Sequence, residues 1–409
     1  MGEMNLMDEY FSILMDKVIG ERRIAGANIL VIKDGEERFF GSFGKADIAR
    51  NMPMKRDSVF RMFSMSKTVT AAAVMILVER GIIDLKDNVE QYLPGFANPM
   101  VAVADEPAAG GDATGKAYHL RPASRSVTIF DLMTMTSGVC YPGIESAAHI
   151  EVGKCLGEYE KKMANAIYPM TVEFANALGR CPLAFDPGER WMYGFSADVL
   201  GAIVEVASGR QFGAFVRDEI LTPLGMLSTS FDMLPGFKDR MTERYEYDPE
   251  TGGIKVLEGI HLGLGDYPEH AHWESGGAGL LSTIDDFAKF GMMLANGGKL
   301  GNVRILSENT VKYMRTNALT DEIKQRDMNW GSTLGHGYNC LMRILEHPEI
   351  QGTIAPAGEF VWDVWMGTYF TIEPVSKSVI LFFIQKAGAG CDDLTRKVRA
   401  IAYGKYLSE

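Results

Sequence analysis

Runs of β-forming residues stand near both ends of this chain of 409 residues, while patterns typical of helices fill its middle. Near the N-terminus, residues 27–47 predict a hairpin whose two β-rich runs flank Asp34-Gly35, a pair suited to a tight primed turn. Near the C-terminus, residues 368–373 and 379–385 predict adjacent antiparallel strands. We therefore expect one sheet built from both ends of the chain, with a helical lobe inserted between its strands.

Helical periodicity accounts for most of the remaining chain. An apolar stripe predicts a first helix over residues 4–19, and a strongly apolar helix follows from Ser64 to a stop at Gly81. Residues 97–125 are rich in Gly, Ala, Pro and Asp and predict a long surface loop. Further helices are expected at residues 127–138, 168–179, 197–209, 285–297 and 392–407.

The order of these elements predicts a single domain over residues 1–409. Its sheet lobe would comprise residues 1–80 and 271–409, approximately, and its helical lobe residues 81–270. We find no internal repeat that would divide the chain further.

Composition excludes several classes of partner. The formal charge of −12 disfavours nucleic acid or an anionic membrane, because both are bound by concentrated Lys and Arg. Five cysteines without a C-x-x-C spacing suggest neither a disulfide framework nor a thiolate zinc site. The first residues lack the basic start and unbroken apolar run of a signal peptide, so we expect a cytoplasmic protein.

The strongest candidate for a reactive site is Ser64-Met65-Ser66-Lys67, at the start of the long apolar helix. A three-residue spacing on a helix brings Ser64 and Lys67 to nearly the same face. A desolvated lysine has a lowered pKa and can take the proton of a serine hydroxyl, which makes the serine a nucleophile. The spacing alone is a weak signal, because Ser42 and Lys45 repeat it between glycines after a strand, where the side chains need not converge.

The surrounding sequence carries a family resemblance. Residues 60–96 resemble the nucleophile helix of the serine β-lactamase and penicillin-binding protein superfamily. Blocks similar to those of class C β-lactamase-like hydrolases, and most of all of the family VIII carboxylesterases, follow in the expected order. They are VTIFDLMTMTSGVCYP, FDPGERWMYGFSADVLGAIVEVASG, ESGGAGLLSTIDDFAKFGMML and GEFVWDVWMGTYFTIEP, the first with Met135 where His is typical.

The resemblance implies a fold and a set of roles. The fold would be α/β (α+β) and β-lactamase/DD-peptidase-like, with a mainly antiparallel sheet flanked by helices. Ser64 would be the acylated nucleophile, Lys67 would share or relay its proton, and Tyr193 would act as base or as proton donor to the leaving group. The N–H groups of Ser64 and Trp365 would form the oxyanion hole. No cofactor and no metal are implied.

Two departures from the family pattern bear on the substrate. The stretch Tyr193–Phe195 lacks the Asn of the β-lactamase Tyr-x-Asn motif, and family VIII esterases lack that Asn too, so esterase is favoured over lactamase. The residue after the tyrosine, which is Ser in those esterases, is Gly194 here. No Lys-Thr-Gly or Lys-Ser-Gly occurs, so a substrate carboxylate has no obvious cation there. Asp363 and Val364 stand where Gly-Gly is usual, and should narrow the groove and add a carboxylate if they point inward.

We therefore expect a serine hydrolase, carboxylesterase-like, that acts on a small-molecule ester or amide and binds neither nucleic acid nor membrane. The sequence leaves open whether water, an alcohol or an amine accepts the acyl group. Aromatic residues would line the acyl or alcohol pocket, although core packing explains them equally well: Trp362, Trp365, Tyr141 and Phe195.

Other functions compete with this one. Within the enzyme class, the alternatives are an amide or peptide hydrolase, a weak β-lactamase or an acyltransferase. A non-catalytic ligand-binding or scaffolding relative is an alternative of another class, motivated by Asp363 and Val364. Residues 110–117 nearly spell a phosphate-binding loop but end in Ala117, and His270 with His272 suggests a metal site only weakly.

Overall fold

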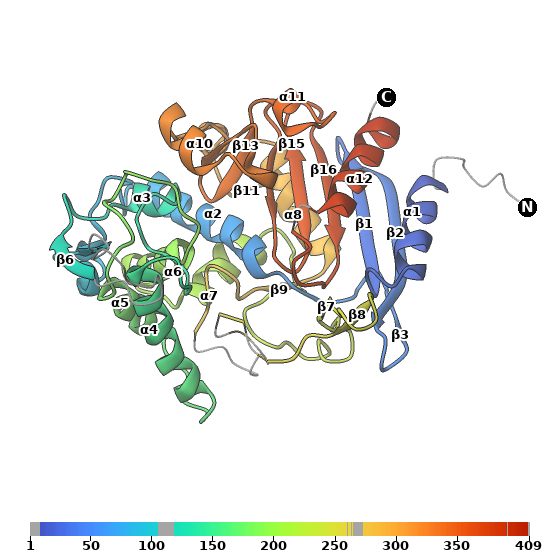
Figure 1. Cartoon of the computed structure of the whole chain (residues 1–409). Helices are drawn as coiled ribbons and strands as arrows, with labels where there is room; N and C mark the ends of the chain where they lie inside the picture. The colour runs from blue at the N-terminus through green and yellow to red at the C-terminus, as the bar shows by residue number, and fades with distance from the viewer. Residues whose placement is uncertain are drawn as a thin grey trace, which may run out of the picture.

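The computed structural model describes residues 9–104, 118–259, 261–262, 264, 273–390 and 392–407. In this part of the chain, one sheet of eight strands joins both ends of the protein in the order β12-β13-β14-β15-β16-β1-β2-β3 (Figure 1). All neighbouring strands are antiparallel. The strands are β1 (Gly26–Lys33), β2 (Glu36–Asp47), β3 (Met52–Pro53), β12 (His336–Asn339), β13 (Met342–Leu345), β14 (Phe360–Asp363), β15 (Tyr369–Glu373) and β16 (Ser378–Phe383).

The predicted joining of the two chain ends is confirmed. β1 pairs with β16 with Leu30 opposite Leu381, so the first and last strands of the fold meet at the centre of the sheet. The hairpin between β1 and β2 turns at Asp34 and Gly35, which have φ angles of 51° and 83°. Positive φ at both central residues is the geometry of the primed turn that the Asp-Gly pair predicts.

Helices cover both faces of the sheet. On one face, α1 (Glu9–Gly20) and α12 (Asp393–Ile401) lie side by side (Figure 1), and Phe11 stacks on Tyr406 with ring centroids 5.1 Å apart. On the other face, α8 (Ile284–Ala295) packs against β15 and β16. The apolar β16 is buried over its whole length because both of its faces are covered.

The nucleophile-helix segment of the sequence forms α2 (Ser66–Glu79), which follows the short 3-10 helix η1 (Phe63–Met65). All residues of α2 except the last two are buried, because the helix packs against α6 and α7 of the helical lobe while its N-terminal end meets the sheet lobe. The predicted stop at Gly81 is confirmed by a φ angle of 65°.

The helical lobe contains most of the middle of the chain. The helices predicted at residues 168–179 and 197–209 are confirmed as α5 and α6. The remaining long helix of this lobe, α4, was not predicted. The lobe comprises α3 (Ile129–Met133), α4 (Ala147–Met163), α5 (Thr171–Gly179), α6 (Ser196–Ser208) and α7 (Phe212–Val216), the last continuing as a π-helical turn over Arg217–Leu221.

Two sequence predictions need correction here. The helix expected at residues 127–138 ends after Met133, since Met135 adopts a left-handed φ of 57° that stops helical hydrogen bonding. The ends of the expected loop at 97–125 pair as the strands β5 (Met100–Ala104) and β6 (Tyr118–Pro122). The residues between these two strands lie outside the described part of the chain.

Shorter elements complete the fold. Among the described residues, no single helix is long and apolar enough to cross a lipid bilayer. The remaining helices are α9 (Glu308–Met314), α10 (Asp321–Asp327) and α11 (Pro348–Gln351), and the remaining strand pairs are β4 (Phe60–Arg61) with β9 (Leu281–Ser282), β7 (Tyr245–Tyr247) with β8 (Ile254–Val256), and β10 (Lys299–Leu300) with β11 (Val303–Arg304).

Candidate active site

Ser64 lies in a strained turn at the junction of the two lobes. Phe63, directly before it, has a φ angle of 42°, a left-handed conformation that is costly for a bulky residue. The Phe63 side chain is buried, and its ring meets the edge of Trp365 at a centroid distance of 6.4 Å. Burial of Phe63 therefore holds the turn that places Ser64 between β4 and the start of α2.

Lys67 is fully buried and makes three hydrogen bonds. Its ammonium group donates to Ser64 Oγ at 3.2 Å, to Tyr141 Oη at 2.9 Å and to the Gly277 carbonyl oxygen at 2.8 Å. Burial lowers the pKa of Lys67 to about 7, against the opposing charge of Asp198. A lysine with this pKa is partly neutral at pH 7, and can then accept the proton of Ser64.

Asp198, on α6, is the buried counter-charge of Lys67. Its carboxylate accepts hydrogen bonds from Ser275 Oγ at 2.5 Å and from the Gly277 N–H at 3.3 Å. Burial raises the pKa of Asp198, and the nearby Lys67 partly offsets that rise. Gly277 accepts from Lys67 through its carbonyl and donates to Asp198 through its N–H, and an added Cβ atom there would overlap the Asp198 carboxylate.

The sequence analysis did not single out Asp198. The signal that could have found it is its place in the family block, five residues after Tyr193 and in the first turn of the helix that follows. Buried carboxylates are almost always paired, so a carboxylate at this place in the block indicates a charged partner, here the buried lysine.

Tyr193 lies beside Lys67 and Ser64, as the resemblance implies. The Lys67 ammonium is 4.7 Å from the centre of the Tyr193 ring. Burial raises the pKa of Tyr193 above its ordinary value, while the Ser64 hydroxyl and the Trp362 indole act in the opposite direction. Tyr193 is therefore a neutral phenol at pH 7, which suits a proton donor better than a base.

Gly194 departs from the family pattern for a steric reason. A Cβ atom at this position would overlap the carbonyl oxygen of Val139 and lie 2.8 Å from the Cα of Cys140. The two backbone segments approach closely there, and this brings Tyr193 next to Tyr141, with ring centroids 5.5 Å apart. Only glycine fits, so the serine of the family VIII pattern is excluded in this chain.

Two of the predicted pocket aromatics, Tyr141 and Trp362, contact Tyr193, and a third, Phe195, packs on Tyr141. Tyr141 contacts Phe195 with ring centroids 4.6 Å apart, and Trp362 packs on Tyr193 at 5.3 Å. Burial raises the pKa of Tyr141 well above its ordinary value, so its hydroxyl stays protonated while it accepts from Lys67. Phe195 is only 1% exposed and packs behind Tyr141, in the core of the helical lobe.

The carboxylate of Asp363 is paired. Arg343, on the neighbouring strand β13, donates a hydrogen bond to Asp363 Oδ1 at 2.5 Å. The same guanidinium donates to the Ser332 carbonyl oxygen at 3.0 Å and lies 5.3 Å from the centre of the Trp362 ring. Val364 is buried at 1% exposure. The family glycines are thus replaced by one ion-paired and one buried residue, and the sequence analysis did not foresee Arg343.

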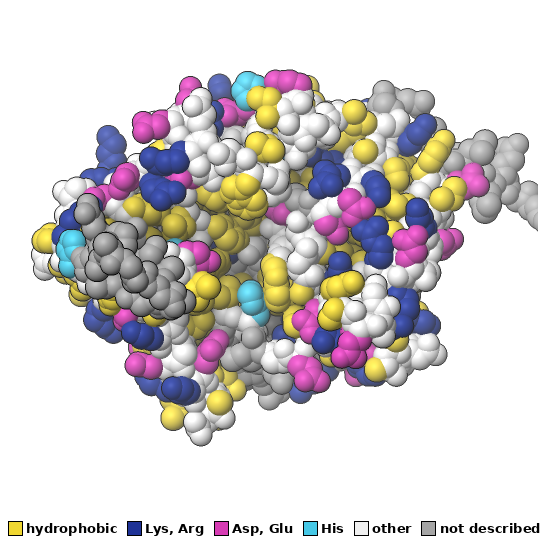
Figure 2. All heavy atoms as spheres, in the orientation of Figure 1, with side chains coloured by type: hydrophobic (Ala, Val, Ile, Leu, Met, Phe, Trp, Pro, Cys, Tyr) yellow, Lys and Arg dark blue, Asp and Glu magenta, His cyan; other side chains and the backbone are white. Residues whose placement is uncertain are grey.

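Trp365 is the exposed member of the predicted set, at 38% exposure. Its indole stacks on the ring of His261, with centroids 3.9 Å apart and planes tilted by 19°. Burial lowers the pKa of His261, and the positive charges of Arg244 and Lys67 lower it further, so the imidazole is neutral at pH 7. Figure 2 shows a hollow between the two halves of the molecule that is lined by hydrophobic side chains.

Two weaker sequence signals fall outside the described part of the chain: the loop at residues 110–117 and the histidines His270 and His272. Within the described part, no group of three or more His, Cys, Asp or Glu side chains could hold a metal ion.

Comparison with known proteins extends the match to nearly the whole chain. The sequence model described as Beta-lactamase matches residues 7–403. The chain belongs to the Beta-lactamase family. The predicted resemblance and fold class are therefore confirmed, and the family includes esterase, peptidase and acyltransferase relatives of the serine-hydrolase type.

Individual members of the Beta-lactamase family are similar over most of their length. Protein Rv1367c of Mycobacterium tuberculosis is 30% identical over 388 residues, which are 93% of this chain and 90% of the relative. Esterase EstB of Burkholderia gladioli is 29% identical, over 90% of this chain and 88% of its own. The structure of EstCE1, a hydrolase with promiscuous acyltransferase activity, superposes with a TM-score of 0.76 at 22% identity, over 97% of this chain and 98% of that chain.

Proposed function

We propose that this protein is a carboxylesterase-like serine hydrolase that acts through an acyl-enzyme on Ser64. The observation that carries the proposal is the Lys67 amine, buried, 3.2 Å from Ser64 Oγ and with a pKa near 7. A lysine held in this state has little structural use, whereas a serine nucleophile needs a base of this strength. The similarity to Esterase EstB supports the choice of esters.

In the acylation step, neutral Lys67 takes the hydroxyl proton of Ser64 while Oγ bonds to the ester carbonyl carbon. The backbone N–H groups of Ser64 and Trp365 would receive the negative charge that develops on the carbonyl oxygen. When the carbon–oxygen bond of the ester breaks, Tyr193 donates its proton to the departing alcohol oxygen. The proton held by Lys67 then returns the phenolate of Tyr193 to a phenol, so charge and protons balance.

The same groups run in reverse for deacylation. A water molecule loses a proton to the neutral Lys67 amine as it attacks the acyl carbon, and the Lys67 ammonium gives that proton to Ser64 Oγ when the serine leaves. An alcohol in place of water would make the reaction an acyl transfer, and the acyltransferase activity of EstCE1 supports testing for it. Hydrolysis is the proposed primary outcome because nothing in the described site is a dedicated acceptor-binding group.

We further propose that the acyl and alcohol groups carry no carboxylate. Arg343 is already ion-paired with Asp363. The buried Lys67 donates its hydrogen bonds to Ser64, Tyr141 and Gly277, so neither cation binds a substrate anion. An ester whose parts are uncharged matches the aromatic surroundings of Tyr193 and Trp362 better than a penicillin or a peptide carboxylate.

The decisive experiment compares nitrophenyl acetate, butyrate and octanoate with a chromogenic cephalosporin. Ser64→Ala should remove ester turnover, whereas Ser42→Ala should keep it, because Ser42 has the same spacing to a lysine but lies on β2 and donates to Asn28. Cephalosporin cleavage faster than ester cleavage would contradict the ester proposal.

Covalent labelling separates an enzyme from a non-catalytic relative. A fluorophosphonate probe should modify Ser64 of the wild-type protein, with the peptide identified by mass spectrometry. Labelling that is spread over several serines, or that persists in Ser64→Ala, would favour the scaffold alternative.

A further inference from the structure

A second cavity, of about 830 Å³, lies at the far end of α2 from Ser64. Val78, near the end of α2, lines it, fourteen residues after Ser64. At a rise of 1.5 Å per residue this separation is about 20 Å, so the cavity is distinct from the candidate active site. Its volume falls in the range of roughly 300–1,000 Å³ that is common for small-molecule sites.

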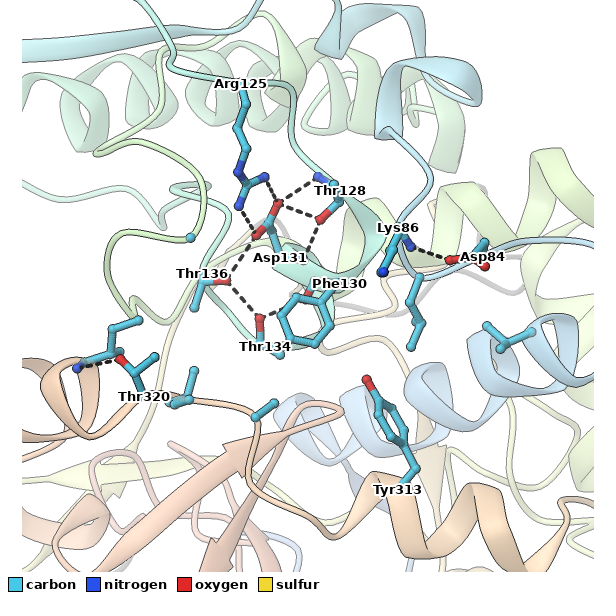
Figure 3. A pocket seen from close by; sticks show the side chains of 16 residues that line it. Asp84, Lys86, Arg125, Thr128, Phe130, Asp131, Thr134, Thr136, Tyr313 and Thr320 are labelled. Atoms are coloured by element: carbon cyan, nitrogen blue, oxygen red, sulfur yellow. Dashed lines mark hydrogen bonds and ion pairs between the residues drawn. The ribbon is translucent and has the colours of Figure 1, made fainter.

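Both lobes contribute walls to this cavity. The helical lobe supplies residues 84–86 and 125–136, and the sheet lobe supplies α9 and the segment that leads into α10 (Figure 3). Much of the lining is apolar: Val78, Leu85, Phe130, Ala318, Leu319 and Ile323. A ligand in this cavity would therefore present an apolar body to both lobes at once.

The most buried charge in the wall is neutralised internally. Asp131 accepts two hydrogen bonds from Arg125, at 2.6 and 2.8 Å, and two more from the N–H and hydroxyl of Thr128, at 2.9 and 2.7 Å. The hydroxyls of Thr134 and Thr136 bond to each other at 2.9 Å. The polar groups on this side of the cavity already have hydrogen-bond partners, so a ligand needs no charged group here.

The cavity also offers two donors, one from each lobe. Figure 3 shows the side chain of Lys86 and the hydroxyl of Tyr313 directed toward the space beside Phe130. In the part of the chain that the structure describes, the Lys86 ammonium forms no ion pair. The adjacent Asp84 is exposed and accepts the backbone N–H of Lys86 at 2.7 Å. Burial raises the pKa of Tyr313 to about 12, so its hydroxyl remains a donor at neutral pH.

We propose that this cavity is a second binding site, for a small carboxylate with an apolar body such as a medium-chain fatty acid. The carboxylate accepts from the Lys86 ammonium and the Tyr313 hydroxyl, and the apolar chain lies against Phe130, Leu319 and Ile323. An anion is favoured because the only unpaired cation of the described lining is Lys86. The inference does not depend on the function proposed for Ser64.

Octanoate is the probe, and 1-octanol is its uncharged match, each titrated calorimetrically against the full chain. Lys86→Met should weaken octanoate binding about tenfold, the effect of losing one charge-assisted hydrogen bond, and leave 1-octanol unchanged. Ala318→Trp should weaken the binding of both, because the indole takes up part of the space between Leu319 and the opposite wall. Ala49→Trp, on an exposed turn after β2, is the matched control and should bind both probes as the wild type does.

Two results would overturn the proposal. Wild-type protein that binds no octanoate at millimolar concentration would show that the cavity takes no such ligand. Octanoate binding that is unchanged in both Lys86→Met and Ala318→Trp would place the bound molecule elsewhere, for example beside Ser64. Lys86 is exposed at the rim of the cavity, so Lys86→Met will fold. This variant therefore decides the outcome even if Ala318→Trp does not fold.

Discussion

Arg343 on β13 forms an ion pair with Asp363 on β14, diagonally across from it, at the end of the strand that leads to Trp365. The Arg343 side chain is 2% exposed, and its guanidinium also covers Trp362, the residue that packs on Tyr193. The pair therefore fixes the wall of the cleft where relatives resembling this chain carry flexible glycines. Because the two charges neutralise each other, the ion pair offers no net charge to a substrate.

Removing one partner of this ion pair should destabilise the protein more than replacing both partners with apolar residues. Asp363→Asn leaves a buried guanidinium without its counter-charge and should cost about 3–5 kcal/mol of unfolding free energy. The double variant Arg343→Met with Asp363→Val should recover most of that loss. Urea unfolding of the wild type and the two variants measures both effects, and equal losses in the single and double variants would show that the unpaired guanidinium is not the source of the loss.

Ester hydrolysis should fall as the pH drops below about 7. Burial lowers the pKa of Lys67 to about 7, and the reaction needs its neutral form, so protonation at lower pH removes the base. The pH profile of kcat/KM should therefore show an acid limb near that value. An acid limb near pH 4–5 would point to a carboxylate base instead.

Asp198→Asn should move this acid limb to lower pH. The negative charge of Asp198 raises the pKa of Lys67, so its removal lowers that pKa further. Asparagine keeps an oxygen that can accept from Ser275 and Gly277, which makes the change mainly electrostatic. Ser275→Ala is the control, since it removes a hydrogen bond to Asp198 but no charge.

Tyr193→Phe should discriminate between leaving groups. If Tyr193 donates a proton to the departing oxygen, its loss should lower kcat by on the order of 10²-fold for an ethyl ester. The loss should be much smaller for a nitrophenyl ester, whose phenolate leaves without protonation. Equal losses for the two esters would assign Tyr193 to the attack step.

Gly194→Ser restores the residue of the family VIII pattern, and we expect it to impair the enzyme. The added Cβ overlaps the Val139 carbonyl oxygen, so the two segments that carry Tyr141 and Tyr193 must separate. Ester turnover should fall at least tenfold, by analogy with other displacements of catalytic groups. The exposed Gly20→Ser, at the end of α1, where nothing lies within 4 Å of an added Cβ atom, measures the cost of a glycine substitution away from the site.

Local patterns predicted the parts of the fold that local physics decides. The Asp34-Gly35 turn and the helix from Ser64 to Gly81 follow from conformational preference and apolar periodicity, and both are confirmed. The short α3 could not be predicted in this way, because the left-handed Met135 is imposed by its buried surroundings rather than by its own preference. The lobe boundaries near residues 80 and 270 stay predictions.

In the candidate site, too, local contacts were predictable and long-range contacts were not. Ser64 and Lys67 are three residues apart, where the 3-10 helix η1 runs directly into α2, so their contact was predictable from helical spacing. Asp198 and Ser275 are separated by 77 residues, and their hydrogen bond depends on how α6 meets the segment before β9. No single-sequence pattern encodes such a pairing, and the resemblance supplied the Tyr193 assignment that spacing alone could not.

The burial of α2 over most of its length ties Ser64, the proposed nucleophile directly before it, to the innermost segment of the protein. The amide hydrogens of such a helix exchange with solvent only when the whole domain opens. Destabilising substitutions elsewhere should therefore reduce the number of active molecules while leaving the rate of each folded molecule unchanged. Heat inactivation should accordingly follow global unfolding, with no earlier phase in which the serine loses its reactivity.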